Sequence, residues 1–336
     1  MRQALSRACV TGGSGFVGQH LVQALRDAGW SVRCAVRASS RTEALEALGA
    51  EVLRLDLLDP AALRAGLAGV DAVFHAAAVL RVPWRRSFLS DNARLSRALA
   101  QACADQAQPP VLVHVSSMAA AGPAGGATPV RESDPPRPIS LYGRSKLAAE
   151  QALAAFADRV PIRIARPPMV FGEPDDRSLK LFQLARRGYL PLPHDPRQRL
   201  SMLHGADLAA LLVRLAEGGE DLHPGHPGHG VYHAAHPGSP TWQEFARLLG
   251  DASGCARVRA LRIPRAALWA SMAAGEVVAR ARDRPSVLTL DKAREATGGA
   301  WVCSTAKIEA LGFTPGASLA ERVLQTGRWY RAQGWL

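Results

Sequence analysis

The chain has 336 residues, 48% of them hydrophobic, which suffices for one large domain with a buried core and a second, smaller domain. Its formal net charge is +12, yet only four of the 41 basic residues are Lys, and the Arg residues are scattered along the chain. This distribution argues against a nucleic-acid-binding protein, although the positive field favours anionic ligands.

Two further features of the composition concern the cellular compartment. No apolar run approaches the ~18 residues that span a bilayer, and no hydrophobic leader precedes the first apolar run. The five Cys show no paired spacing, and Cys9 and Cys34 fall within apolar runs, so we expect reduced, buried thiols. We therefore expect a cytoplasmic protein without an integral membrane segment.

A glycine-rich turn near the start of the chain predicts a phosphate-binding site. Gly12, Gly15 and Gly18 follow the apolar run 8–10 with the spacing G-x-x-G-x-x-G, and a helical apolar pattern comes next. Gly12 would permit the tight turn, Gly15 would let a pyrophosphate approach the backbone, and Gly18 would let helix and strand pack closely. We interpret this stretch as a dinucleotide-binding turn.

Short apolar runs then alternate with helical patterns. The predicted strands lie at 31–37, 51–56, 72–78, 111–115 and 162–166. The predicted helices lie at about 41–48, 60–67, 88–105 and 142–157. Alternation at this spacing indicates a parallel sheet with helices on both faces, so the predicted fold class is α/β, with a Rossmann-type doubly wound sheet.

The end of the second predicted strand concerns the choice of cofactor. In dinucleotide folds an acid at this position binds the ribose 2′-hydroxyl, whereas an Arg accepts a 2′-phosphate. Arg37 stands at this position, and no acidic residue follows before Glu43. The sequence therefore favours NADP(H), with NAD(H) still possible. Asp56 and Leu57, just past the third strand, are expected to reach the adenine.

Tyr142 and Lys146 are four residues apart and therefore lie on one face of a predicted helix. A Lys ammonium favours the tyrosinate and lowers the pKa of the phenol toward neutrality, which makes it a usable acid or base. Ser116 and Ser117 end the preceding strand, where a hydroxyl could hold a substrate oxygen beside Tyr142. This combination predicts an acid–base site with a hydroxyl to hold a substrate oxygen.

Taken together, these motifs resemble the extended short-chain dehydrogenase/reductases of the NAD-dependent epimerase/dehydratase superfamily, nearly from end to end. The resemblance implies that Tyr142 is the proton donor, that Lys146 binds the nicotinamide ribose and tunes Tyr142, and that Ser117 is the catalytic Ser. The implied cofactor-binding residues are Gly12, Gly15, Phe16, Val17, Gly18, Arg37, Asp56, Leu57, Ala76, Ala77, Ala78, Tyr142, Lys146 and Pro167.

Three positions place the chain among the branches of this family. Arg166-Pro167-Pro168 is similar to the 3β-hydroxysteroid dehydrogenase and dihydroflavonol reductase branch, and Met169 replaces the Asn usual in sugar-nucleotide enzymes. Asn92 resembles a family Asn, but Leu95 and Ser96 replace the neighbouring Gly-Thr. The resemblance implies hydride transfer between a nicotinamide and the carbonyl or secondary alcohol of a mostly apolar small molecule. The alternatives are a sugar-nucleotide epimerase or dehydratase that uses bound NAD, and a cofactor-binding regulatory protein.

The same resemblance divides the chain. Residues 1–166 and 200–236 would form the cofactor-binding Rossmann domain, and residues 167–199 and 237–336 a smaller C-terminal α/β substrate-binding domain. It also implies a homodimer formed partly by the Tyr142 helix.

Three remaining segments do not correspond to any of the motifs described above. Residues 123–139 read as a surface connector or a flap, and the apolar helix at about 264–282 reads as core, as pocket wall or as a lipid-facing patch. Five imidazoles lie between 223 and 238: His223, His226, His229, His233 and His236. Their spacing, interrupted by Pro and Gly, fits no tight ligand set, so we expect a loop and no metal site.

Overall fold

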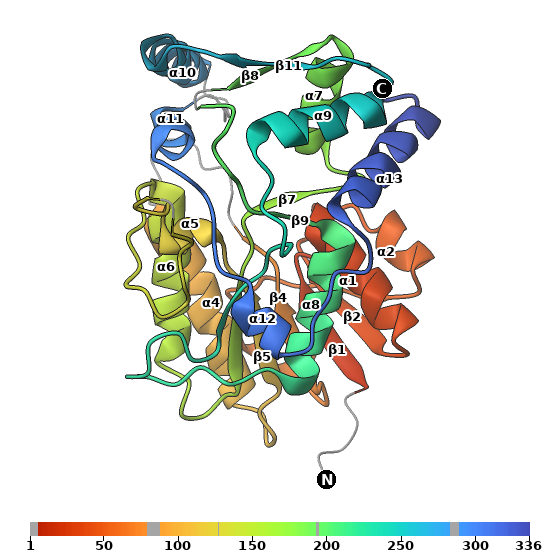
Figure 1. The fold of residues 1–336 in the computed structure, drawn as a ribbon. Coiled ribbons are helices and arrows are strands. Elements are labelled where there is room, and N and C mark those ends of the chain that lie inside the picture. Colours follow the sequence, from red (N-terminus) through yellow and green to blue (C-terminus); the bar gives the residue numbers. More distant parts are fainter. Residues whose placement is uncertain (1–5, 79–87, 127, 193–194, 283–288) are drawn as a thin grey trace.

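The computed structural model describes residues 6–78, 88–126, 128–192, 195–282 and 289–336 (Figure 1). Its centre is a seven-stranded parallel sheet with the order β10-β6-β5-β4-β1-β2-β3. The strands are β1 (Arg7–Thr11), β2 (Ser31–Val36), β3 (Glu51–Arg54), β4 (Ala72–His75), β5 (Val111–Val115), β6 (Ile162–Arg166) and β10 (Val231–His233). The predicted Rossmann-type α/β fold class is confirmed.

Helices cover both faces of this sheet because alternate strand residues are buried on opposite sides. The helices of this part are α1 (Phe16–Asp27), α2 (Glu43–Ala47), α3 (Pro60–Gly66), α4 (Phe88–Ala104), α5 (Met118–Ala121), α6 (Leu141–Ala154), α8 (Gly205–Gly218) and α12 (Ala306–Ala310). Val10 packs in one cluster with α1 and α8, whereas Cys9 packs in a second cluster with α4 and α6. The predicted burial of Cys9 and Cys34 is confirmed.

The strand order reverses between β1 and β4. The chain runs from β1 outward to β3 and then resumes on the other side of β1 with β4. In open parallel sheets, ligands bind outside the carboxyl ends of the strands at such a point. The glycine turn follows β1 and residues 76–78 follow β4, so the topology brings both segments to one crevice.

The remaining elements lie beyond the carboxyl ends of these strands (Figure 1). The strands there are β7 (Met169–Phe171), β8 (Tyr189–Leu192), β9 (Met202–His204) and β11 (Arg259–Arg262). The helices are α7 (Asp176–Arg186), α9 (Trp242–Ser253), α10 (Arg265–Ala281), α11 (Leu290–Thr297) and α13 (Leu319–Ala332). Phe171, Phe182, Phe245 and Tyr330 belong to the separate hydrophobic core of this part. The division of the chain into two domains at the predicted boundaries stays a prediction.

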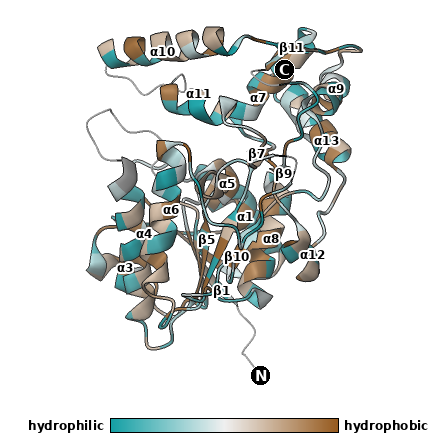
Figure 2. Ribbon diagram, turned by 60° about the vertical axis from the view of Figure 1, so that its left-hand side comes forward, coloured by the Kyte–Doolittle hydropathy of each residue, from teal (hydrophilic) through white to brown (hydrophobic). Residues whose placement is uncertain are grey.

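Helix α10 forms where the apolar pattern predicts it, but it is not a core helix. Leu268 is its only buried residue, whereas Val277 and Val278 are 62% and 48% exposed. The helix lies at one extremity of the molecule, far from the sheet (Figure 2). Of the readings open from the sequence, a core helix is therefore excluded, because α10 packs mainly on α11 and nearly all its residues are exposed or half-buried. No helix in the described parts of the chain is both long and apolar enough to cross a bilayer.

The described residues of the 123–139 segment are held by backbone hydrogen bonds along its length. Ala124 N donates to Ala300 O at 2.8 Å, Val130 N to Val302 O at 3.0 Å, and Arg137 N to Ala121 O at 2.8 Å. These bonds favour the surface connector over the flap.

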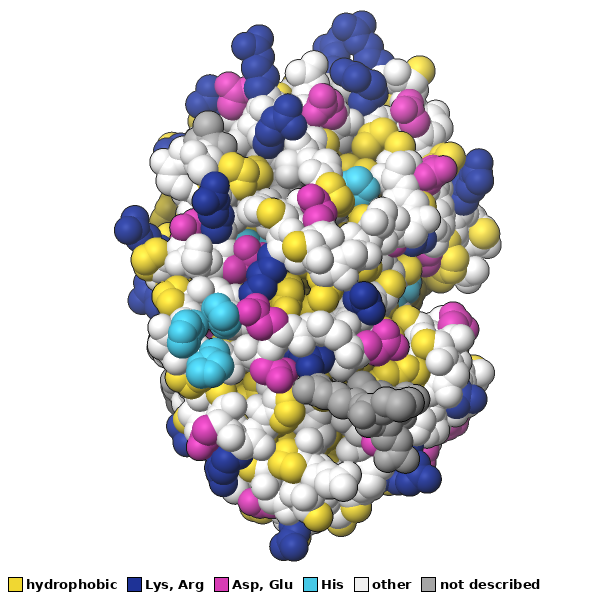
Figure 3. Space-filling view, turned by 60° about the horizontal axis from the view of Figure 1, so that its bottom comes forward, with side chains coloured by type: hydrophobic (Ala, Val, Ile, Leu, Met, Phe, Trp, Pro, Cys, Tyr) yellow, Lys and Arg dark blue, Asp and Glu magenta, His cyan; other side chains and the backbone are white. Residues whose placement is uncertain are grey.

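The His-rich segment forms an exposed loop that leads into β10. His223, His226 and His229 are exposed, and His229 pairs with Glu220 at 2.9 Å. Across the described ranges, no cluster of three or more His, Cys, Asp or Glu side chains is placed to hold a metal ion. On the face shown in Figure 3, basic and acidic side chains are interspersed rather than gathered in one stripe.

Candidate cofactor and active site

The glycine turn between β1 and α1 packs too tightly for side chains at two of its three glycines. Gly12 has φ +75°, and a Cβ atom on it would lie 2.6 Å from the backbone nitrogen of Ala77. A Cβ atom on Gly18 would overlap the carbonyl oxygen of Gly12. At Gly15 the nearest atom would be Gly12 O at 3.3 Å, so the other side of Gly15 is open. Two glycines thus serve packing, and the third leaves its backbone accessible.

Helix α1 begins at Phe16 with Gly15 as its N-cap residue. No side chain caps this helix, and no acidic residue lies in its first turn. The N–H groups of the first turn, including those of Phe16 and Val17, have no acceptor within the helix and carry a partial positive charge. The open backbone of Gly15 together with this helix end fits the pyrophosphate of a dinucleotide.

The ribose-discriminating position is exposed. Arg37 directly follows β2, and its guanidinium makes no hydrogen bond or ion pair with the described residues. The loop after it is held by Arg54, whose Nη1 donates to Ala38 O at 2.9 Å. Past β3, Asp56 is exposed and Leu57 is half-buried. These residues border the carboxyl end of the sheet, as predicted.

The end of β4 approaches the glycine turn from the other side. Ala76 N donates to Thr11 O at 3.1 Å, and residues 76–78 are half-buried. The buried His75 bonds through Nδ1 to Thr11 Oγ1 at 2.8 Å and through Nε2 to Ser96 Oγ at 3.2 Å. Burial and the nearby Lys146 ammonium lower the pKa of His75 to about 3, so this imidazole is neutral.

The Ser117 side chain lies beside the Tyr142 phenol, where hydrogen bonding from Ser117 acts to lower the pKa of the phenol. Ser117 is the N-cap residue of α5, where its Oγ also accepts from Ala119 N at 3.1 Å. Tyr142 lies in the first turn of α6 and Lys146 lies one turn further on. The fold therefore brings together the three residues that the motif predicts.

The predicted lowering of the pKa of Tyr142 is wrong for this structure. Burial, with a smaller contribution from the Glu295 carboxylate, raises the pKa of Tyr142 to about 12, against the opposing effects of Ser117 and Arg177. Lys146 Nζ donates to Val115 O at 2.8 Å, at the end of β5. Burial lowers the pKa of Lys146 to about 8 against the opposing charge of Glu150. The Lys146 ammonium is thus bonded to the sheet, and burial is the largest influence on the pKa of the Tyr142 phenol.

A buried network that the sequence analysis did not predict holds α6 against the sheet. Arg166 donates from Nε and Nη2 to the two carboxylate oxygens of Glu150, at 2.9 and 2.6 Å. Ser116 Oγ donates a further hydrogen bond to Glu150. Such bidentate pairs fix geometry as well as charge. The one signal in the sequence was that Glu150 lies four residues after Lys146, on the same helix face.

Two further predicted residues lie beside this helix. Asn92 is buried, and its Nδ2 donates to Ser145 Oγ at 3.2 Å, which in turn donates to Tyr142 O at 2.8 Å. Pro167 is buried after β6, and its carbonyl accepts from Met118 N at 2.8 Å. Asn92 therefore contacts the back of the Tyr142 helix, and Pro167 anchors α5.

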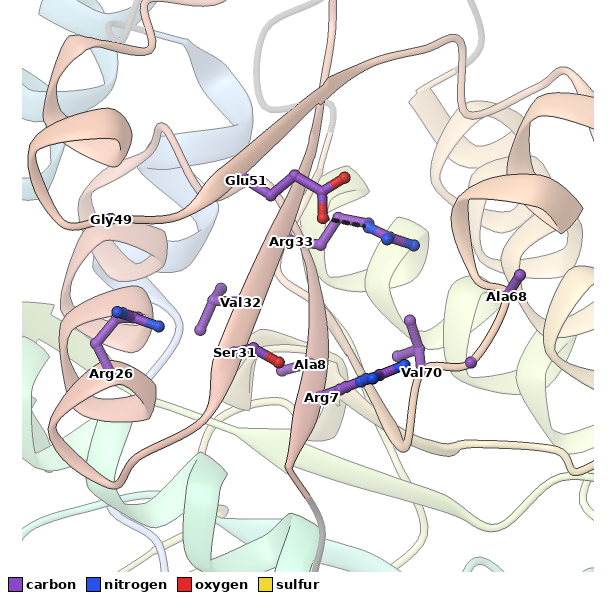
Figure 4. Close-up of a pocket in the computed structure, with 11 residues that line it drawn as sticks. Arg7, Ala8, Arg26, Ser31, Val32, Arg33, Gly49, Glu51, Ala68 and Val70 are labelled. Carbon is purple, nitrogen blue, oxygen red and sulfur yellow. Dashed lines mark hydrogen bonds and ion pairs between the residues drawn. The ribbon is translucent and has the colours of Figure 1, made fainter.

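A hollow of about 310 Å³ lies elsewhere, at the amino ends of β1 and β2 (Figure 4). Arg7, Arg26, Arg33 and Glu51 are among the residues that line it, and Arg33 Nε pairs with Glu51 at 2.9 Å. Because ligands of doubly wound sheets bind at the carboxyl ends of the strands, we do not assign the cofactor to this hollow.

Comparison with known proteins gives the same family as the motifs and the fold. The sequence model of the family described as "NAD dependent epimerase/dehydratase family" matches residues 8–228. The chain is 32% identical to a ceramide reductase of Caulobacter vibrioides, with 97% of this chain and 95% of that protein covered. It is 30% identical to the 4-hydroxy-2-methyl-3-oxo-4-farnesyl-3,4-dihydroquinoline-1-oxide ketoreductase of Stigmatella aurantiaca, with 82% and 81% covered.

A solved structure shares the fold over nearly its whole length. The crystal structure of dTDP-glucose 4,6-dehydratase from Streptomyces venezuelae, with NAD bound, has a TM-score of 0.74 at 24% identity and covers 98% of both chains. The resemblance inferred from the motifs is confirmed: the chain belongs to the NAD dependent epimerase/dehydratase family.

Proposed function

We propose that this protein is an NADP(H)-dependent reductase or dehydrogenase that acts on the carbonyl or secondary alcohol of a mostly apolar small molecule. The observation that carries the proposal is the placement of the Ser117 side chain beside the Tyr142 phenol, with the buried Lys146 one helical turn away. These groups lie at the same edge of the sheet as the glycine turn.

The residues that would hold the cofactor follow from the crevice. Gly12, Gly15 and Gly18 with the start of α1 would bind the pyrophosphate, and Asp56 with Leu57 would border the adenine. Residues 76–78, Tyr142, Lys146 and Pro167 would surround the remainder. A nicotinamide bound in this crevice would supply or accept the hydride.

The preference for NADP(H) is supported by Arg37. Its guanidinium is exposed and unpaired among the described residues, at the end of β2 where the adenosine ribose is bound in this fold. An Arg can bind a 2′-phosphate through two charge-assisted hydrogen bonds. We therefore place the 2′-phosphate of NADP(H) on Arg37, with NAD(H) as the weaker ligand.

The proton chemistry belongs to Tyr142 and Ser117. With a pKa of about 12, raised by burial, the Tyr142 phenol carries its proton at neutral pH and can donate it. A substrate oxygen held between Tyr142 and Ser117 would receive two hydrogen bonds as negative charge develops on it. Tyr142 would then transfer its proton to that oxygen in reduction and remove it in oxidation.

An apolar substrate is supported by two observations. Two relatives are named as reductases of apolar molecules. One is the ceramide reductase, and the other is the farnesyl-dihydroquinoline oxide ketoreductase. Met169, which begins β7 beside the active-site edge, offers a thioether where sugar-nucleotide enzymes carry an amide. The extension of this substrate class to the present chain is our proposal.

The stoichiometry of the cofactor tests the proposal against an epimerase or dehydratase that regenerates bound NAD. The protein is incubated with NADPH and a panel of apolar ketones, and separately with UDP- and dTDP-sugars, while the absorbance of reduced nicotinamide is followed. We expect one NADPH consumed for each alcohol formed. Conversion of a sugar nucleotide without net change in cofactor, or turnover with neither panel, would overturn the proposal.

A further inference from the structure

Helix α11 contacts the start of the helix that carries Tyr142. Asp291 Oδ1 accepts from Leu141 N at 2.7 Å, and its Oδ2 accepts from Tyr142 N at 3.3 Å. Asp291 is 150 residues away from Leu141 in the sequence. The first N–H groups of a helix have no acceptor within the helix, and a carboxylate there is favoured by the helix dipole.

A second carboxylate of α11 acts through the N-cap residue of α6. Ser140 Oγ accepts from Gly143 N at 2.9 Å and donates to Glu295 Oε1 at 2.6 Å. Glu295 Oε2 in turn pairs with Lys292 Nζ, which lies 5.1 Å from the centroid of the Tyr142 ring. Helix α11 thus contacts the backbone of the first turn of α6, its N-cap residue Ser140, and the ring of Tyr142.

This arrangement differs from that of two capped helices beyond the carboxyl ends of the strands. Helices α9 and α13 have complete capping boxes, in which Glu244 and Glu321 lie three residues after their own N-cap residues. In α6 the acidic partners come from a distant helix, so the position of the first turn depends on where α11 lies. Tyr142 belongs to this turn, so the same contacts fix the backbone position from which its side chain extends.

We propose that Asp291 and Glu295 are positioning residues, which hold the first turn of α6 so that the Tyr142 phenol reaches the substrate oxygen beside Ser117. This inference rests on the proposed function, because it takes Tyr142 as the proton donor. It adds that the C-terminal part of the chain completes the site by fixing that donor.

The charges around Tyr142 allow the role of Glu295 to be separated from that of Asp291. The groups that act on the phenol or contact its ring are Ser117 at the start of α5, Arg177 from α7, and Lys292 and Glu295 from α11, while the Lys146 ammonium is bonded to Val115 O. The Glu295 charge raises the pKa of Tyr142. Glu295→Gln keeps an oxygen acceptor for Ser140 but removes the charge, so Tyr142 should titrate at lower pH.

The first experiment compares Asp291→Ala, Asp291→Asn and the control Glu244→Ala in the full-length protein. The control removes a carboxylate from a different helix N-terminus, away from Tyr142. We expect kcat to fall ~10²-fold in Asp291→Ala, since displacement of a reacting group by about 1 Å has such an effect, with KM for NADPH within about twofold. Asp291→Asn, which keeps one acceptor, should recover most of kcat, and Glu244→Ala should keep it.

The second experiment needs no turnover. The protein is labelled with 3-fluorotyrosine, the Tyr142 signal is assigned by its loss in Tyr142→Phe, and its ¹⁹F shift is titrated with pH. We expect a lower midpoint in Glu295→Gln than in the unmodified protein. An active protein in which Asp291→Ala keeps its kcat, or an unchanged midpoint in Glu295→Gln, overturns the inference. An unmodified protein that reduces no carbonyl overturns the proposed function instead, while the titration still tests α11.

Discussion

Gly15 and Gly18 lie three residues apart in one turn, yet they are glycine for different reasons. Gly18 has no space for a Cβ atom, which would overlap Gly12 O, whereas Gly15 has an open side. We expect Gly18→Ala to destabilise the fold measurably and Gly15→Ala to fold normally but bind NADPH more weakly. Thermal unfolding and fluorescence titration with NADPH measure the two effects. Normal stability of Gly18→Ala would show that the turn can relax.

The cofactor preference depends on a single side chain in this account. Because the Arg37 guanidinium makes no hydrogen bond or ion pair with the described residues, Arg37→Ala should leave the fold intact. Loss of a charge-assisted contact should weaken NADPH binding by ~10-fold or more while NADH binding stays nearly unchanged. Arg41→Ala, an exposed neighbour, is the control. Equal dissociation constants for NADPH and NADH in the unmodified protein would contradict the assignment.

At the scale of residues, the sequence allowed prediction of those site residues that lie in short local motifs. Gly12, Gly18, Ser117, Tyr142 and Lys146 could be proposed as site residues because each lies in a short pattern with a known spacing. The pKa of Tyr142 was predicted in the wrong direction because burial, which depends on the whole fold, outweighs the neighbouring Lys. The partners Glu150 and Asp291 were missed because they meet their targets only in three dimensions.

At the scale of elements, α6 is held by a buried ion pair as well as by its cap. Glu150→Leu leaves the Arg166 guanidinium buried without its partner, and both side chains are only 6% exposed. We expect the free energy of unfolding to fall by about 3–5 kcal/mol. Glu51→Leu, which removes the exposed partner of Arg33, should lower it by about 1 kcal/mol or less. Urea unfolding of the two variants checks this contrast, and equal losses would contradict it.

Elements with strong periodicity were predicted, whereas two of the shortest strands, β7 and β9, were not. The strands β5 and β6 lie at the predicted bounds, since β5 is apolar except for His114 and β6 has apolar residues at 162, 164 and 165, with Arg at 163 and 166. The strands β7 and β9 have three residues each and were missed, because so short a run has no readable period. Helix α10 was predicted at nearly its bounds but its environment was left open, since an Ala-rich pattern does not tell an exposed helix from a buried one.

At the scale of the whole molecule, buried neutral histidines make stability depend on pH. Burial lowers the pKa of His75 and of His233 to about 3, from the usual 6.5, and lowers the pKa of His114 as well. The unfolded chain therefore binds protons below pH 6.5 that the folded chain does not. The His204 contact and backbone hydrogen bonding lower the pKa of Glu173 to about 2 despite its burial, which extends the same effect below pH 4.5.

We therefore expect the free energy of unfolding to fall as the pH drops from 7 toward 4. Each buried His contributes a slope of up to ~1.4 kcal/mol per pH unit between its unfolded and folded pKa values. Urea unfolding at pH 7.5, 6.5 and 5.5 measures the slope. His114 has no hydrogen-bond partner among the described residues, so His114→Leu should reduce the slope without leaving a partner unpaired. Constant stability across this range would contradict the burial of neutral imidazoles.

The central claim, that Tyr142 transfers the proton while a nicotinamide exchanges hydride with a carbonyl, is tested most directly by one comparison. The kcat for reduction of a ketone by NADPH is measured for the unmodified protein, for Tyr142→Phe and for the control Tyr189→Phe in β8. We predict a fall of ~10²-fold or more in Tyr142→Phe, with the dissociation constant for NADPH retained and Tyr189→Phe unaffected. A Tyr142→Phe variant that reduces the ketone at a near-normal rate would contradict the account.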